Sequence, residues 1–291
     1  MAPKPNPAFR WGILLNSIYI VAEVGAGLAV GSLALVADAL HNLADVLGLA
    51  IAWFAAWLAC KAPTLRRTYG YKGSSIMAAL TNAVFLLVAM GAIIVESIGR
   101  FSHPEPVQGG IVMLVATVGI LVNAGTAVLF HKGQGHDLNI RGAFLHMAAD
   151  AGVSLGVVIA GGVTMLTHWE WLDPAVSILV ALVVLVGTWG LLRDAVNLAM
   201  AAVPKAIDTE AVRACINDFP SVMSCHDLHI WALSTTDVAL TVHVMRATDE
   251  ANDQFLEKLG ERLRGNFDIA HVTIQVEYGD YQPLRFKDNP Y

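Results

Sequence analysis

Charged residues are scarce in this 291-residue chain. Asp, Glu, Lys and Arg together make up 14% of it, against roughly a quarter in a typical soluble domain, while 56% of the residues are hydrophobic. The net charge of −6 is mild and there is no long basic run, so no nucleic-acid partner is expected. This composition indicates a membrane protein surrounded by lipid.

Cysteine is rare as well. Cys60, Cys215 and Cys225 are scattered and form no CxxC pair. Their spacing argues against a disulfide scaffold and against a thiolate zinc ribbon, and it fits a reducing cytoplasmic face. The sequence has no nucleotide-binding loop and no nucleophile–base pair, so we do not expect an enzyme.

Long apolar runs occupy the first two thirds of the chain. Crossing a hydrocarbon core of about 30 Å takes roughly 20 apolar residues. The first run has no small-residue cleavage site, so we interpret it as a retained helix rather than a signal peptide. Six stretches are long enough to cross: 11–31, 34–59, 78–100, 111–130, 142–167 and 174–200.

Lysine and arginine are unevenly distributed between the loops that join these stretches. The N-terminal tail and the loops 60–73 and 131–141 are basic, whereas the opposite loops offer only Arg100. By the positive-inside rule, both termini are expected to be cytoplasmic. The basic residues are Lys4, Arg10, Lys61, Arg66, Arg67, Lys72, Lys132 and Arg141.

The pattern changes after residue 203. Asp208 is suited to cap a short helix that ends near Phe219. We expect a six-helix transmembrane domain over 1–203, followed over 204–291 by a small cytoplasmic α+β module of order α-β-β-α-β, ferredoxin-like or metallochaperone-like. Its remaining elements are a hairpin from two alternating stretches, 225–233 and 238–245, an amphipathic helix at 249–267 and a strand at 269–278.

Ionisable residues recur at one spacing inside two predicted spans. His41 and Asp45 are four apart and share a helix face, and His146 and Asp150 repeat this arrangement in the fifth span. Two imidazoles and two carboxylates suit a tetrahedral divalent metal, zinc above all. A single such residue could instead bond a neighbouring helix. Two pairs favour a transport site, because ionisable groups at membrane depth are rare and usually line a pathway.

Other polar residues in the spans have two interpretations. Asp38 lies one turn before His41, and it is either an outer partner of the site or part of a proton route, or else it bonds a backbone or serine group. Glu23 and Asn16 in the first span either line the same cavity or hold helices together.

Strand alternation divides the cytoplasmic module into an apolar and a polar face. Val272, Ile274, Val276 and Tyr278 point to one side of the last strand, and the neighbouring strand alternates in the same way. Two helices can cover only the apolar side. The polar side is left to solvent, to a metal or to a dimer partner; it carries His243, His271 and Glu277.

Several segments together resemble the cation diffusion facilitator family, in its bacterial zinc/cadmium/cobalt branch. They include "GSLALVADALHNLADVLGLA", "LNIRGAFLHMAADAGVSLG", "WLDPAVSILVA" and "CHDLHIWAL". The likeness runs from about residue 10 to 278, and the paired His-x-x-x-Asp motifs are its most specific part. It implies an inner-membrane homodimer that exports Zn²⁺, with Cd²⁺ and Co²⁺ also tolerated, in exchange for protons. The implied transport site is His41, Asp45, His146 and Asp150.

The resemblance also implies cytoplasmic metal ligands at His226, His243 and Glu277. Gln275 stands where some members have a second histidine, so a full binuclear cluster is not expected. Strict alternation puts His226 and His229 on opposite faces. We follow the resemblance for His226 and keep His229 as the alternative, with a metal-free polar dimer face as a third possibility.

Two metal sites of relatives are not expected in this chain. Thr64, Arg67 and Tyr71 occupy the positions of a second site in the loop after the second span, and they cannot form it. His131 and His136 are the only histidines in the loop after the fourth span, which suits solvated side chains better than metal collection.

The exchange of metal for protons has its own chemical basis. Imidazoles and carboxylates bind metal only when deprotonated, which makes His41 and His146 the expected proton carriers. Two alternatives stay open. One is export of cobalt, nickel or iron; manganese is disfavoured because it prefers oxygen ligands. The other is a metal-responsive membrane receptor or scaffold, which would not need two buried ionisable pairs.

Overall fold

The computed structural model describes residues 7–103, 106–131, 138–248 and 252–278, with the side chains of some helical residues, 138–148 among them, left outside this description. The chain divides into two compact units. The first contains residues 1–51 and 81–191, and the second contains 52–80 and 192–291. The expected domain boundary between residues 203 and 204 stays a prediction.

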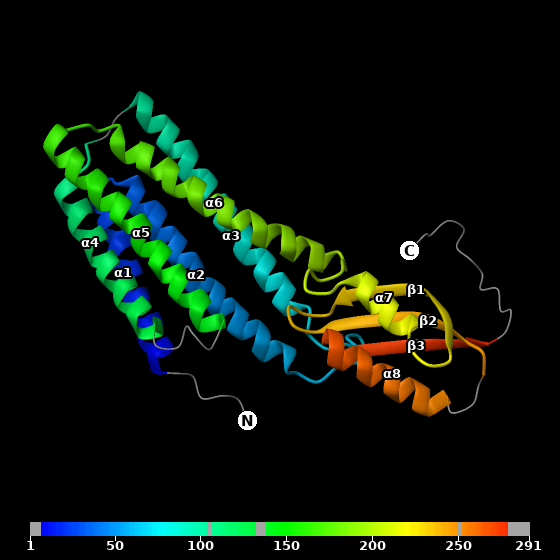
Figure 1. The fold of residues 1–291 in the computed structure, drawn as a ribbon. Coiled ribbons are helices and arrows are strands. Elements are labelled where there is room, and N and C mark those ends of the chain that lie inside the picture. The colour runs from blue at the N-terminus through cyan, green and yellow to red at the C-terminus, as the bar shows by residue number, and fades with distance from the viewer. Residues whose placement is uncertain (1–6, 104–105, 132–137, 249–251, 279–291) are drawn as a thin grey trace. The chain divides into compact units, whose positions relative to one another are not determined.

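Six helices fill the stretches expected to cross the membrane (Figure 1). In the described part of the chain, four of them, α3 to α6, are long and apolar enough to span a bilayer, and α1 adds a shorter apolar stretch. The expected helical membrane-type domain is confirmed. The helices are α1 (Pro7–Val30), α2 (Leu33–Ala59), α3 (Ser74–Ser102), α4 (Gly109–His131), α5 (Leu138–Thr167) and α6 (Leu172–Ala199).

Small residues allow the helices of the first unit to pack closely. Ala37 and Ala44 of α2 are fully buried in its core. Between α4 and α5, a Cβ atom added to Gly161 would lie 3.0 Å from the backbone oxygen of Gly109. Small side chains favour this approach because lipid is as apolar as the helices and packing must hold them together. Polar groups inside such a bundle need partners from the protein itself.

The second unit contains a three-stranded sheet of order β1-β2-β3. β1 (Val222–Ala232) and β2 (Val238–Arg246) form the expected antiparallel hairpin. β3 (His271–Tyr278) pairs parallel to β2, which requires a crossover, and α8 (Asn252–Phe267) provides it. With α7 (Thr209–Asn217), the observed order is the expected α-β-β-α-β.

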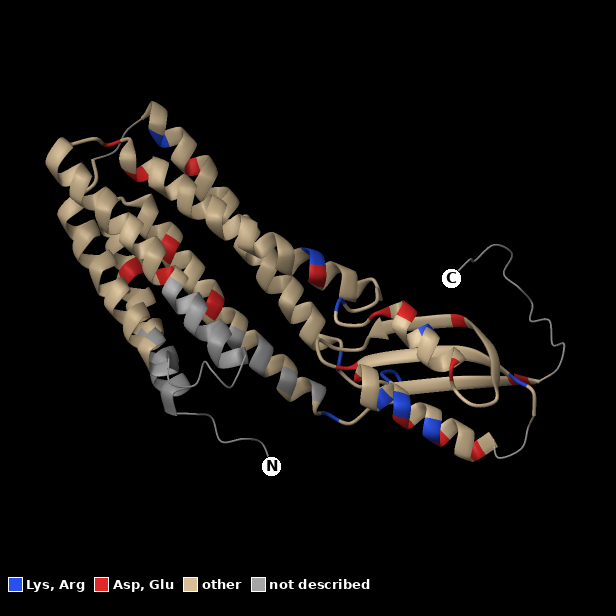
Figure 2. Ribbon diagram, in the orientation of Figure 1, with Lys and Arg blue, Asp and Glu red and all other residues tan. Residues whose placement is uncertain are grey.

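Helices α7 and α8 cover the apolar face of this sheet. Leu240, Val242 and Val244 of β2 are buried in one cluster with residues of both helices, as strand alternation predicts. The carboxylate of Asp208 caps α7, accepting hydrogen bonds from the amides of Glu210 and Ala211. Thr241 and His243 lie on the opposite face of β2, outside this cluster. Figure 2 shows the charged residues alternating along α8 and sparse along the long helices.

The loop between α2 and α3 is fixed against the turn of the hairpin within the second unit. Lys72 Nζ lies 3.4 Å from Asp237 Oδ2, and the amide of Thr235 donates a hydrogen bond of 3.0 Å to Ser75 Oγ. These two contacts hold the start of α3 against the β1–β2 turn.

Candidate metal centres

Three ligand-type side chains meet between α2 and α5 in the first unit. His41 Nε2 lies 3.3 Å from Asp150 Oδ1 and 3.8 Å from Asp45 Oδ2. One ligand atom from each residue lies within 4.8 Å of the other two. Imidazole nitrogen and carboxylate oxygen are donors that zinc accepts in tetrahedral sites. The structure thus brings together three of the four residues expected at the transport site.

The fourth expected ligand is His146. It lies in α5, one turn before Asp150, but its side chain lies outside the described residues. The complete four-ligand set therefore stays a prediction.

Accessibility differs across this cluster. The side chain of Asp45 is 29% exposed, that of His41 16% and that of Asp150 3%. An ion could therefore approach past Asp45, while Asp150 forms the closed end of the site.

A second set of polar side chains lies beside this cluster and is fully enclosed. Ser154 of α5 donates a hydrogen bond of 3.0 Å to Asp38 Oδ2, so the expected serine partner of Asp38 is present. Glu23 of α1 accepts hydrogen bonds from Tyr19 Oη at 2.5 Å and from Asn42 Nδ2 at 3.3 Å. Glu23 therefore joins α1 to α2.

The second unit contains another ligand cluster, on the polar face of the sheet. His243 Nδ1 lies 2.8 Å from Glu277 Oε1, and His226 Nε2 lies 3.3 Å from Glu277 Oε2. The three residues place ligand atoms within 4.8 Å of one another. His226 Nε2 and Glu277 Oε2 are buried beside each other, and neither makes a hydrogen bond with any other described residue. Two buried ligand atoms without such bonds fit a cation between them.

A bulge in β1 brings His226 into this cluster. The pairing with β2 shifts between His226 and His229, and Asp227 in the bulge has φ +51°. As a result, His226 pairs opposite His243. Strict alternation was wrong at this point because an extra residue reverses the faces of the strand. His229 contacts Asp227 instead, with Nε2 3.0 Å from Oδ1.

Asp227 is a further candidate metal ligand, which strand alternation does not predict. Its Oδ2 lies 3.7 Å from His243 Nε2, at the edge of the cluster. An Asp inside an alternating strand was the available signal, since Asp is one of few residues that tolerate a left-handed backbone. Cys225, one residue before His226, packs against the apolar core, and burial raises the pKa of its thiol, which does not favour a thiolate ligand.

The end of β3 differs from the expected alternation. Glu277 is 6% exposed, and Gln275 Nε2 donates to its Oε1 at 3.1 Å. Tyr278, expected on the covered apolar face, is exposed, and its hydroxyl donates to Asn252 Oδ1. The two histidines shield Glu277 on the polar face, which alternation alone does not reveal. His271 lies outside the cluster, edge-on to the ring of Tyr69.

The two parts of the sequence match two profiles of one family. Residues 10–198 match the cation efflux transmembrane domain, and residues 204–278 match the cytoplasmic domain of cation efflux proteins. The chain belongs to the cation diffusion facilitator family. The zinc/cadmium/cobalt branch is supported by relatives over most of the chain. This family consists of transporters, not enzymes, and the chain is an integral membrane protein.

Three relatives illustrate the match. The zinc transporter ZitB of Escherichia coli is 37% identical over 95% of this chain and 89% of its own length. The metal cation efflux system protein CzcD of Cupriavidus metallidurans is 36% identical over 93% and 86%. The cadmium, cobalt and zinc/H⁺–K⁺ antiporter of Bacillus subtilis is 34% identical over 89% and 85%.

Solved structures also match part of the chain, and one of them illustrates this. It is described as the metal-bound C-terminal domain of the CzcD transporter from Cuprividus metallidurans. It is 44% identical, covers 24% of this chain and 99% of its own, and has a TM-score of 0.23.

The loop after α2 contains Thr64, Arg67 and Tyr71. Thr64 and Arg67 form a turn through two mutual backbone hydrogen bonds, and Arg67 Nη1 donates to Tyr71 Oη at 3.0 Å. The guanidinium also lies 4.6 Å from the centre of the Tyr71 ring. Arg67 and Tyr71 thus form a cation–π contact, and Thr64 closes the turn with Arg67. His136 and the side chain of His131 lie outside the described residues.

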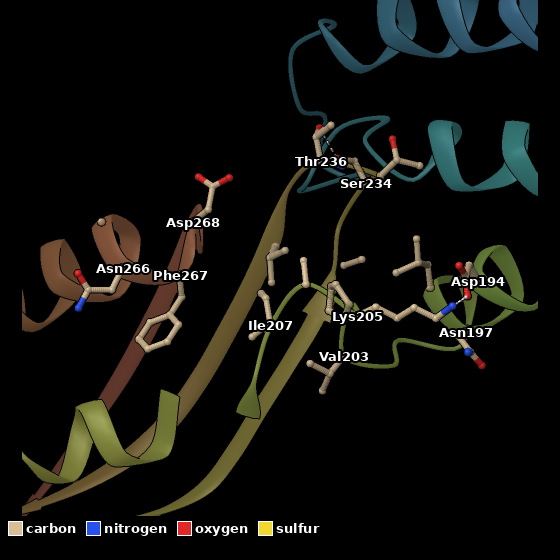
Figure 3. Close-up of a pocket in the computed structure, with 17 residues that line it drawn as sticks. Asp194, Asn197, Val203, Lys205, Ile207, Ser234, Thr236, Asn266, Phe267 and Asp268 are labelled. Atoms are coloured by element: carbon tan, nitrogen blue, oxygen red, sulfur yellow. Dashed lines mark hydrogen bonds and ion pairs between the residues drawn. The ribbon is translucent and has the colours of Figure 1, made fainter. Parts of the chain in front are cut away.

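A cavity of about 560 Å³ in the second unit has a different character. It lies between the end of α6, the linker to α7, the β1–β2 turn and the end of α8 (Figure 3). Lys205 reaches across it to Asp194, with Nζ 2.5 Å from Oδ1. Its lining includes no histidine or cysteine among the described residues, so its chemistry does not resemble that of the two clusters.

Proposed function

We propose that this protein is a proton-coupled antiporter that exports divalent metal cations from the cytoplasm. Zn²⁺ is the preferred substrate, with Cd²⁺ and Co²⁺ also carried. The observation that carries this proposal is the cluster of His41, Asp45 and Asp150 on two membrane helices, with ligand atoms within 4.8 Å. The names of the relatives, which include zinc transporters and a cadmium, cobalt and zinc antiporter, support the substrate class.

His146 completes the transport site as the fourth ligand. It precedes Asp150 by one turn, as His41 precedes Asp45. Two imidazoles and two carboxylates would give a tetrahedral nitrogen and oxygen set, which suits zinc and cobalt better than manganese.

Proton coupling follows from the chemistry of these ligands. Each binds metal only in its deprotonated form, so metal binding displaces protons and protonation displaces metal. If the site opens alternately to the two sides, an inward proton gradient drives metal outward. The histidines are the groups suited to exchange protons near neutral pH.

Both termini are assigned to the cytoplasm of a bacterial cell, with the helices in the inner membrane. The support is the excess of lysine and arginine in the tail and in the loops on one side. Residues 1–203 form the transport domain and residues 204–291 the cytoplasmic domain in this proposal.

The cytoplasmic domain is proposed to bind zinc and to form a homodimer. His226, His243 and Glu277 would hold the ion, and the absence of hydrogen bonds at His226 Nε2 and Glu277 Oε2 supports this. The polar face of the sheet, which α7 and α8 leave uncovered, is available to a second subunit.

Efflux from intact cells tests the proposed direction and site. Zinc-loaded cells that express the wild-type chain should lose zinc faster than cells with an empty vector. The Asp45→Asn variant should lose it no faster than the empty vector. Glu96→Gln is the matched control, because Glu96 is an exposed acid on α3 paired with Arg100. Wild-type efflux from Asp45→Asn cells would refute the site.

A further inference from the structure

Two carboxyl groups are buried among the helices of the first unit without belonging to the metal cluster. Glu23 on α1 and Asp38 on α2 are both 0% exposed. Glu23 Oε2 accepts a hydrogen bond of 3.3 Å from Asn42, which lies one turn after Asp38 on α2, so the two carboxyls are buried close to each other and their charges interact. In the described part of the chain, neither has a lysine or arginine partner.

Three of the four carboxyl oxygens receive hydrogen bonds. Tyr19 donates to Glu23 Oε1, Asn42 to Glu23 Oε2, and Ser154 to Asp38 Oδ2. Asp38 Oδ1 is also buried, but no donor of the described residues reaches it. A proton on the facing Glu23 carboxyl would supply the missing donor.

Electrostatics favours a proton at this pair. Two adjacent carboxylates repel each other, and burying each negative charge without a cation adds a desolvation cost. One shared proton removes the repulsion and one of the two buried charges. The other titratable groups that face the pair are Tyr19, on the Glu23 side, and His41 and Asp150, on the Asp38 side.

Gly119 of α4 leaves space for the Tyr19 hydroxyl that donates to Glu23. A Cβ atom added at Gly119 of α4 would overlap the Tyr19 hydroxyl that binds Glu23. Tyr19 Oη also lies 3.5 Å from the backbone oxygen of Val115 on the same helix. The hydroxyl is therefore held by α4 and aimed at the carboxyl.

The pair is placed to respond to an ion on the neighbouring cluster. Asp38 lies one turn before His41 on α2, and Ser154 lies one turn after Asp150 on α5. The Asp38–Ser154 bond and the His41–Asp150 contact are thus adjacent links between the same two helices. Residues one turn apart have Cβ atoms about 5–6 Å from each other. A divalent cation at His41 would favour the charged form of both carboxyls.

We propose that Glu23 and Asp38 form a proton-binding site separate from the metal ligands, which gives up its proton when metal occupies the adjacent cluster. The proton leaves to water on the side to which the transport site is open, and two carboxylates remain beside the cation. When metal departs, the pair takes up a proton again. This inference rests on the proposed function. It adds one proton, carried by Glu23 and Asp38, to those that the metal ligands exchange.

Proton release on zinc binding tests the proposal. The purified full-length protein would be titrated with zinc in a weakly buffered solution containing a pH indicator, and protons released and zinc bound would both be counted. Glu23→Gln should bind as much zinc as the wild type but release about one proton fewer at the transport site. Both proteins keep the cytoplasmic cluster, so protons released there are the same in each and do not affect the difference between them. Glu96→Gln should match the wild type.

Infrared difference spectroscopy, which compares the protein with and without zinc, tests the proposal on the wild type without any substitution. Zinc should remove a protonated-carboxyl band, and Glu23→Gln should lack this change. Equal proton release by the wild type and Glu23→Gln, with zinc bound to both, would overturn the proposal, as would the absence of the band change in the wild type. If the wild-type protein binds no zinc that depends on Asp45, the proposed function itself fails.

Discussion

His41 on α2 and Asp150 on α5 face each other, with Nε2 3.3 Å from Oδ1. The contact joins two helices that are about 110 residues apart in the sequence, and Asp45 adds a third ligand atom within 4.8 Å. In a bundle whose other buried contacts are mostly apolar, this is where a divalent cation would find several donors at once.

Removing the Asp150 carboxylate should disable the site. Asp150→Asn keeps the shape of the side chain but loses the negative charge, and it should weaken zinc binding at the transport site by at least about tenfold, since even groups one step removed from a metal typically cost 10–100-fold. Equilibrium binding of zinc to the purified protein measures this. Glu96→Gln should bind like the wild type, and an unchanged affinity in Asp150→Asn would exclude Asp150 as a ligand.

The metal preference should depend on the nitrogen of His41. His41→Asp replaces an imidazole by an oxygen donor, which should shift the site away from zinc and toward manganese. Competition between the two metals, measured by transport into vesicles, gives the ratio of their rates. The same ratio in the variant and the wild type would show that His41 does not select the ion.

Much of the fold could be predicted from the sequence because the signals are local. Apolar runs of membrane length predict the long helices, and alternation in 238–245 and 269–278 predicts the strands. The spacing of His41 and Asp45 predicts their shared face. The hydrogen bond between Glu23 and Asn42 could not be predicted, because it depends on how α1 packs against α2 rather than on any local period.

The bulge in β1 shows a second limit. One residue in a left-handed conformation, Asp227, reverses the alternation and places His226 beside His243. No periodic pattern in the sequence identifies a residue that forms a bulge. For the same reason the burial of Glu277, which depends on His226 crossing to its side, was not predicted.

The bulge also yields a prediction about the cytoplasmic cluster. Asp227→Gly should keep the bulge, since glycine adopts positive φ freely, and it should retain zinc binding by His226, His243 and Glu277, because the Asp227 carboxylate lies only at the edge of the cluster. Asp227→Val should weaken zinc binding, because a β-branched residue strains this backbone by roughly 1–3 kcal/mol and favours regular pairing that moves His226 away. Zinc titration of both variants tests this. Equal binding by the two would mean that the bulge does not position His226.

The carboxylate of Glu277 contacts both histidines of the cytoplasmic cluster and should be needed for its metal. Glu277→Gln should reduce zinc affinity there by at least about tenfold and weaken the stabilisation of the dimer by zinc, while some transport remains. Glu261→Gln, at an exposed position of α8, is the control. Zinc-dependent dimer stability can be followed by thermal unfolding, and wild-type behaviour of Glu277→Gln would refute the ligand assignment.

Zinc flux into sealed vesicles under an imposed pH gradient tests the exchange of metal for protons most directly. The full-length protein would be reconstituted into vesicles with an acidic interior and supplied with zinc outside. We expect zinc to accumulate inside while the gradient lasts, to stop when a protonophore collapses it, and not to accumulate with Asp45→Asn. Zinc entry at the same rate with and without the gradient would contradict proton coupling, and wild-type accumulation by Asp45→Asn would contradict the transport site.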